Sequence, residues 1–147
     1  MKSQVLLLVA LCVSGCSTIE PAHSYGDKPL PSLKSAFVSY RKGSDPDIAQ
    51  YICEALTQHG VKTSAGYEEN RPKDVDFYAT YASHKQWDMK MYLDTLSIQF
   101  LDGSSGQLIA TGQFRNSALH TYPDVRKTTF DVVQSMYESK TDKSKSK

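Results

Sequence analysis

The chain has 147 residues, of which 39% are hydrophobic and 22% are charged. This length allows one compact domain, and this composition excludes both a wholly disordered chain and a protein with several membrane spans. Lys and Arg number 17 against 16 Asp and Glu, and Lys2 lies in an N-terminal leader, so the remainder is neutral. We do not expect a nucleic-acid-binding protein, because that class needs positive charge to neutralise phosphates.

Residues 1–15 have the layout of a secretory signal peptide. Lys2 precedes an apolar run over residues 5–13. The run is too short to span a bilayer, which needs about 20 apolar residues. The alternative is a buried N-terminal strand or helix, but the charge layout favours a leader that is removed from the mature protein.

The residues that follow the apolar run are Val13, Ser14, Gly15 and Cys16. They resemble the lipobox of bacterial lipoproteins. The resemblance implies that the Cys16 sulfur carries a diacylglycerol, that the leader is cut before Cys16 and that the new amino group is acylated. Ser17 stands in the sorting position of this family and implies export to the outer membrane. Because two or more buried acyl chains hold a protein stably on a membrane, we expect a lipid-anchored domain that faces the periplasm.

Two polar segments flank the predicted domain. Residues 16–31 are expected to be the acylated cysteine and a flexible tether, since they contain three prolines and little apolar periodicity. Residues 139–147 are expected to be a disordered polar tail. The α+β domain then spans residues 32–138. Cys53 is the one thiol left in the mature chain, so no internal disulfide is expected.

The first half of the domain reads as strand, helix, strand, strand. Residues 35–40 predict a short strand, and Ser44 or Asp45 is expected to cap a helix that has Pro46 in its first turn. Gly60 is expected to end this helix in a left-handed conformation. Residues 61–65 and 75–84 predict two further strands.

Residues 86–102 predict one long strand with a change of phase. Trp87, Met89, Met91 and Leu93 share one face, whereas Leu96, Ile98 and Phe100 have the opposite parity. A two-residue period changes phase only at an extra residue or a break, so we expect a β-bulge or bend near residues 94–95. The alternative is an unbroken strand with apolar side chains on both faces, which would lie against the membrane or a partner. The candidate partner-binding surface comprises Trp87, Met89, Met91 and Tyr92.

The second half of the domain ends in a hairpin and a helix. Asp102 to Gly106 predicts a hairpin loop, and the next strand runs to Phe114. Its Gly-Ser-Ser-Gly sequence looks superficially like a nucleophile or phosphate loop. A hairpin turn is the better interpretation of this sequence, because no helix N-terminus follows it to supply the N–H donors of a phosphate loop. A second helix carries Val125, Thr129, Val132, Val133 and Met136 on one side.

The element order is therefore β-α-β-β-β-β-α, which predicts a two-layer α+β sandwich. We expect a mostly antiparallel sheet of about five strands with two helices on one face. The last four strands are expected to form a meander. The first and second strands are expected to be neighbours or near-neighbours joined by a crossover helix.

The chain carries few candidates for chemistry. It has no phosphate loop, no dinucleotide fingerprint and no metalloprotease or hydrolase motif. The histidines at 23, 59, 84 and 120 lie at no ligand spacing, so we expect no metal, no cofactor and no enzymatic activity. An enzyme would require His84, His120 and a carboxylate to converge in a pocket.

The lipobox and the element order together resemble the small outer-membrane lipoproteins of Gram-negative bacteria. One group, uncharacterised, has a capped helix ending in Leu-x-x-x-Gly and an Asp-aromatic strand, which correspond here to Leu56, Gly60 and Asp76-Phe77-Tyr78. The lipoprotein subunit of the lipopolysaccharide translocon has a similar element order. The leading hypothesis is a non-enzymatic envelope lipoprotein that binds another envelope component, expected to be a protein. The alternative is an inhibitor or immunity-type lipoprotein that neutralises a toxin or hydrolase.

Overall fold

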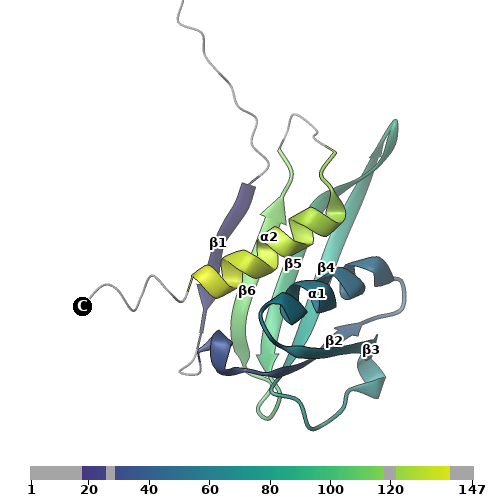
Figure 1. Cartoon of the computed structure of the whole chain (residues 1–147). Coiled ribbons are helices and arrows are strands. Elements are labelled where there is room, and N and C mark those ends of the chain that lie inside the picture. Colours follow the sequence, from purple (N-terminus) through teal and green to yellow (C-terminus); the bar gives the residue numbers. More distant parts are fainter. Residues whose placement is uncertain (1–17, 26–28, 118–121, 140–147) are drawn as a thin grey trace, which may run out of the picture.

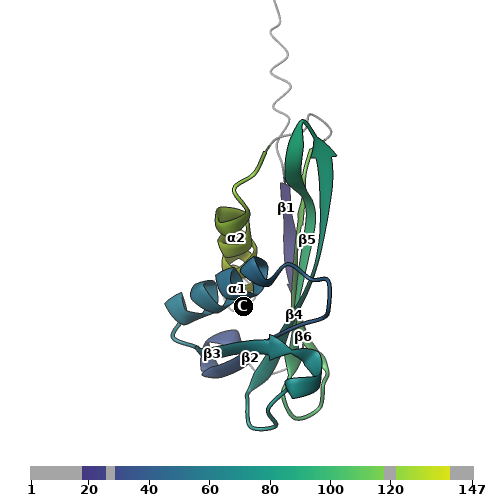
Figure 2. The same ribbon diagram turned by 90° about the vertical axis from the view of Figure 1, so that its right-hand side faces the viewer.

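A six-stranded mixed sheet and two helices form two layers, with both helices on one face of the sheet (Figures 1 and 2). The computed structural model describes residues 18–25, 29–117 and 122–139. In chain order the elements are β1 (Thr18–Ser24), the 3-10 helix η1 (Leu30–Ser32), β2 (Ser35–Tyr40), α1 (Pro46–Gln58), β3 (Lys62–Tyr67), the 3-10 helix η2 (Glu68–Asn70), β4 (Phe77–Asp88), β5 (Lys90–Asp102), β6 (Leu108–Arg115) and α2 (Val125–Glu138). The strand order in the sheet is β1-β6-β5-β4-β2-β3. The predicted two-layer α+β fold is confirmed.

The strands that flank β2 both run parallel to it. Val38 of β2 is in register with Ala65 of β3 on one side and with Ala79 of β4 on the other. The expectation that the first two predicted strands are neighbours is confirmed. The expected meander of four strands is wrong in its first member. The chain returns between β3 and β4 through η2, so β3 lies at the sheet edge and only β4, β5 and β6 form the meander.

Part of the predicted tether is folded, which corrects the expectation that residues 16–31 are flexible. β1 pairs antiparallel with β6, and Ile19 packs against the core. Leu30 of η1 is fully buried. Pro21, which suggested a tether, lies where the β1 register shifts, between Glu20 and His23. An irregular edge strand accommodates proline because the missing N–H breaks no regular ladder there.

Helix α1 begins and ends where its sequence indicates. Of the two predicted caps, Asp45 is the one used, because its carboxylate accepts a 3.1 Å bond from the Asp47 N–H. Gly60 has a φ of 77°, and the Val61 N–H reaches back to the Leu56 carbonyl at 3.2 Å. This 6→1 hydrogen bond is typical of the Schellman motif, which a glycine in the left-handed conformation permits.

The hydrophobic core lies between the sheet and the two helices. The Phe77 and Phe100 rings, both fully buried on adjacent strands, have centroids 4.9 Å apart. Gly112 of β6 lets α2 approach the sheet closely, since a Cβ there would lie 2.8 Å from Met136 Cγ and 2.9 Å from Val132 Cγ1. Residues that alternate with the core positions on β2, β4 and β5 face away from the helices and are mainly polar.

The segment predicted as one long strand is two strands joined by a tight turn. Met89 lies between β4 and β5 with a φ of 59°. The single strand is therefore wrong. The bulge is confirmed, because His84 pairs with Thr95 and Lys85 with Leu93, which leaves Asp94 as the extra residue. The sequence concealed the turn because Trp87 and Met91 are cross-strand partners on one face, so the alternation continues through it.

Candidate functional site

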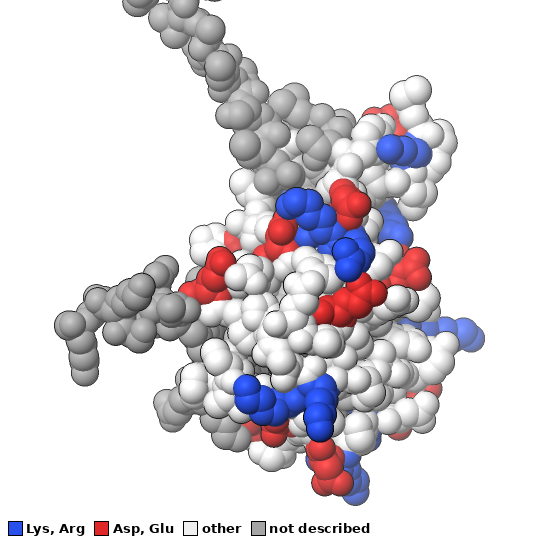
Figure 3. All heavy atoms as spheres, viewed as in Figure 1, with Lys and Arg blue, Asp and Glu red and all other residues white. Residues whose placement is uncertain are grey.

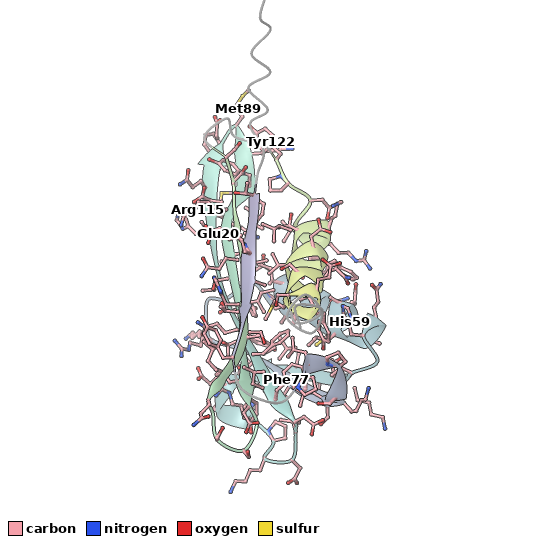
Figure 4. The ribbon with its side chains drawn as sticks, turned by 90° about the vertical axis from the view of Figure 1, so that its left-hand side faces the viewer. Glu20, His59, Phe77, Met89, Arg115 and Tyr122 are labelled. Atoms are coloured by element: carbon pink, nitrogen blue, oxygen red, sulfur yellow. The ribbon has the colours of Figure 1, made fainter. Side chains whose placement is uncertain are left out.

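The β4–β5 hairpin extends beyond the rest of the sheet and ends in exposed apolar side chains (Figures 1 and 4). Within the described residues, β6 pairs with β5 as far as Thr95 and Asn116 donates to the Leu93 and Asp94 carbonyls, so residues 85–92 form a two-stranded ribbon. Trp87 is 72% exposed, Met89 87% and Met91 56%. We call these three residues the hairpin tip. Figure 3 shows this end as mainly uncharged atoms, whereas acidic and basic groups intermingle over the helices.

Tyr92 does not belong to this surface, which corrects the predicted set of four residues. It is 5% exposed and pairs with Gln86, on the opposite face of the ribbon from Trp87 and Met91. Its hydroxyl donates a 2.9 Å bond to Gln86 Oε1. Burial raises the pKa of the Tyr92 phenol, and the Asp94 carboxylate raises it further.

Tyr122, which the sequence did not single out for the site, braces the hairpin. Its hydroxyl donates a 2.8 Å bond to the Asp88 carbonyl, and its ring meets Tyr92 edge-on at 5.7 Å and 88°. The Lys90 ammonium lies 4.2 Å from the centroid of the same ring. Tyr122 comes from the segment that precedes α2. A single aromatic residue before Pro123 does not indicate, from the sequence alone, a contact with Tyr92, which lies 30 residues earlier in the chain. It holds one face of the ribbon and leaves the Trp87–Met91 face open.

The base of the hairpin is tied to helix α1. Lys85 forms an ion pair with the carboxylate of Asp45, the residue that caps α1. The Tyr81 hydroxyl donates a 2.6 Å bond to the Asp45 carbonyl oxygen. Burial and the nearby Asp45 carboxylate raise the pKa of Tyr81. The ribbon therefore leaves the domain from a base that is fixed by α1.

A polar hollow of about 330 Å³ lies over the sheet where β2, β4, β5 and η2 meet. Glu68 bridges two arginines, with Oε2 2.6 Å from Arg41 Nε and Oε1 3.0 Å from an Arg71 guanidinium nitrogen. Arg71 also donates to Ser39 Oγ at 2.9 Å and lies over the Tyr78 ring at 5.1 Å. The hydrogen bond from Arg41 lowers the pKa of Glu68. One carboxylate faces two guanidinium groups, so the lining keeps a net positive charge, and no histidine lines the hollow to activate its hydroxyl groups.

The remaining candidates do not assemble into a site within the described residues. His84 is exposed on β4, opposite Thr95, and His59 stacks on Tyr137 at 3.8 Å. His120 and Cys16 lie outside the described residues. No three His, Cys, Asp or Glu side chains gather as metal ligands in the described ranges.

The loop after β5 is a turn, as predicted. The Asp102 carboxylate accepts bonds from the N–H groups of Ser104 and Ser105 at 3.0 and 2.9 Å. Side-chain acceptors of this kind organise tight turns.

The helices in the described part of the chain are all too short or too polar to cross a membrane.

Comparison with known proteins identifies similar folds but no family. No protein-family model and no curated protein matches the chain. A PelC dodecamer from Paraburkholderia phytofirmans is similar, with a TM-score of 0.53 and 14% identity over 79% of this chain and 96% of that one. A PDZ domain protein from Parabacteroides distasonis gives a TM-score of 0.52 and 12% identity over 82% of this chain, but only 35% of that one. A minor lipoprotein from Acinetobacter baumannii gives 0.40 and 16% identity over 75% of this chain and 93% of that one. At these identities, the two matches with TM-scores above 0.5 establish a shared fold and nothing more.

Proposed function

We propose that this protein is a non-enzymatic lipoprotein of the bacterial envelope, anchored in the outer membrane by acyl chains on Cys16, whose domain binds another envelope component. The observation that carries the proposal is the hairpin tip. Apolar surface is expensive to expose to water, about 25 cal/mol per Å². A ribbon that extends from the domain, is braced by Tyr122 and ends in Trp87, Met89 and Met91 is a surface built for contact.

The absence of enzymatic activity in this proposal is supported by the chemistry of the hollow. Its one carboxylate, Glu68, is paired with both arginines, and the hydrogen bond from Arg41 lowers the pKa of Glu68, which makes this carboxylate a weak general base for the serine and threonine hydroxyls. A nucleophile needs an effective base or a strongly lowered pKa to act. A role in binding is therefore preferred to a role in catalysis.

The anchor is tested by mass spectrometry of the protein purified from envelope membranes. The expected mature chain begins at Cys16 and carries the mass of its acyl chains. The matched variant Cys16→Ser should keep residues 1–15 and lose lipid attachment, because serine offers no sulfur to modify. A wild-type chain with a bare thiol and an intact leader would overturn the proposal.

The binding role is tested by affinity capture of the acylated protein from envelope membranes under native conditions. A reproducible envelope protein that is absent from the Cys16→Ser capture is the expected result. A tight one-to-one complex with a single toxin or hydrolase would instead favour the alternative, an inhibitor or immunity-type lipoprotein.

A further inference from the structure

We propose that the hairpin tip inserts into the headgroup region of the membrane that carries the Cys16 anchor, so that lipid is the component bound by Trp87, Met89 and Met91. This inference rests on the proposed function, since it requires the anchor. It goes further by assigning the tip to the bilayer, which leaves other surfaces of the domain for a protein partner.

The strand registers place the start of the chain's folded part and the tip at the same end of the molecule. Arg115 of β6 pairs with Thr18 of β1 on one side and with Thr95 of β5 on the other. Thr18 and Thr95 are therefore level along the strand direction. Figure 1 shows the purple N-terminal end of β1 pointing toward the end from which the β4–β5 hairpin extends. A membrane reached by the N-terminal segment is thus on the hairpin's side of the domain.

The lengths make contact between the tip and the bilayer unavoidable in this orientation. On β4 five residue steps separate His84, the partner of Thr95, from Met89, and at 3.3 Å per residue the ribbon extends about 17 Å past Thr18. Cys16 is two residues before Thr18, and two extended residues reach at most about 7 Å. When the strands stand along the membrane normal and the acyl chains of Cys16 are in the bilayer, the tip lies roughly 10 Å deeper than the Cys16 backbone. Amphipathic elements at membrane surfaces bury their apolar faces about 5–10 Å deep.

The side chains at the tip suit lipid. Trp87 and Met91 are large, apolar and on one face, and Met89 occupies the turn itself. Tryptophan and tyrosine concentrate at membrane interfaces because their rings are apolar and carry one polar atom. Lys90 and Asp88 at the same turn have opposite charges, so the tip has no net attraction for anionic headgroups. Burial of apolar surface drives the insertion, and it should occur in zwitterionic membranes.

The shape of the tip disfavours a protein as its sole occupant. A large aromatic side chain buries about 150–250 Å², so even three of that size would bury less than the roughly 800 Å² that a standard protein interface buries on each partner, and two of the three here are the smaller Met89 and Met91. The tip is convex, and a protein would need a complementary pocket for it. A fluid bilayer adapts to the shape and needs none. The brace from Tyr122 to the Asp88 carbonyl keeps the ribbon extended so that it reaches the membrane.

Trp87 is the one tryptophan of the chain, which makes the protein its own depth probe. The acylated full-length protein is reconstituted into phosphatidylcholine vesicles with increasing fractions of brominated phosphatidylcholine, which quenches only tryptophan in contact with lipid. The expected result is a blue-shifted Trp87 emission and a loss of intensity that grows with the brominated fraction. The matched control Trp87→Phe with Tyr67→Trp moves the probe to the exposed β3 edge, where no quenching is expected. A second variant, Met89→Lys with Met91→Lys, keeps Trp87 and should lose most of the quenching.

The outcomes separate the insertion from the anchor. Vesicle-bound, acylated protein whose Trp87 emission matches that of the Tyr67→Trp control would overturn the insertion and leave the anchor standing. Protein that does not float with vesicles and has an unmodified Cys16 would overturn the proposed function itself. Photocrosslinks from position 91 that capture a protein instead of lipid in native envelopes would overturn lipid as the occupant.

Discussion

Tyr122 makes a quantitative prediction about the local stability of the hairpin. Its hydroxyl bond to the Asp88 carbonyl spans 2.8 Å at an exposed site, where such a bond contributes about 0.5–1.5 kcal/mol. The substitution Tyr122→Phe removes this bond alone. Since 1.4 kcal/mol is a factor of ten, the opening equilibrium of the hairpin should rise roughly 2- to 12-fold.

The substitution Tyr122→Ala also removes the two ring contacts. The edge-on contact with Tyr92 at 5.7 Å contributes about 0.5–1.5 kcal/mol. The Lys90 ammonium, 4.2 Å from the ring centroid, contributes about 0.5–1 kcal/mol. The opening equilibrium of the hairpin in this variant should therefore increase by a factor that lies between roughly ten and several hundred.

Hydrogen–deuterium exchange with peptide-level readout checks both values, because it reports local opening separately from global unfolding. Amides of residues 86–92 should exchange faster in both variants, in the order Ala above Phe. Amides of β2 and α1 should not change, because local opening of residues 86–92 leaves these two elements packed in the core. Tyr25→Phe is the matched control, an exposed tyrosine on the β1 side, and should leave the hairpin unaffected. Unchanged exchange over residues 86–92 in Tyr122→Ala would refute the brace.

Four further substitutions test packing and burial. Gly103→Ala should lower the free energy of unfolding by about 2 kcal/mol or more in urea denaturation, because the new Cβ would lie 1.9 Å from the Val75 carbonyl oxygen. Gly106→Ala, with φ +69° and open space around the new Cβ, should lower this free energy by only about 1 kcal/mol. Equal losses in the two variants would contradict this reasoning. Tyr137→Phe should leave the protein equally stable or more stable by up to about 1 kcal/mol, because burial raises the pKa of Tyr137 to about 12 and its hydroxyl has no partner among the described residues; a clear loss in thermal unfolding would count against it. Burial lowers the pKa of His59 from 6.5, so the stability it confers is complete above pH 6.5 and decreases as the pH falls through the lowered pKa; His59→Gln should flatten this decline in urea titrations between about pH 7 and 5, and an unchanged slope would contradict the assignment.

The sequence determined the features that depend on neighbours along the chain. The ends of α1 are examples, because Asp45 and Gly60 act on backbone groups within a few residues of themselves. The bulge at Asp94 is another, because a two-residue period records every extra residue. The apolar character of Trp87, Met89 and Met91 is a property of the residues themselves, and the structure shows that all three side chains are exposed.

Only the tertiary structure decided which distant segments meet. The sequence of Thr18–Ser24 indicates a tether, but in the structure this segment pairs with the edge of β6 as a strand. At the other edge of the sheet β3 pairs with β2, and the chain then returns to β4 through η2. Tyr122 supports the ribbon through a contact with Tyr92 across 30 residues, which no local pattern encodes. The turn at Met89 escaped detection because cross-strand partners share a face, so a hairpin and a continuous strand leave the same alternation in the sequence. Pairing between strands depends on which strand edges with free N–H and C=O groups meet in space. The sequence indicates that pairing only where the two strands are close together in the chain.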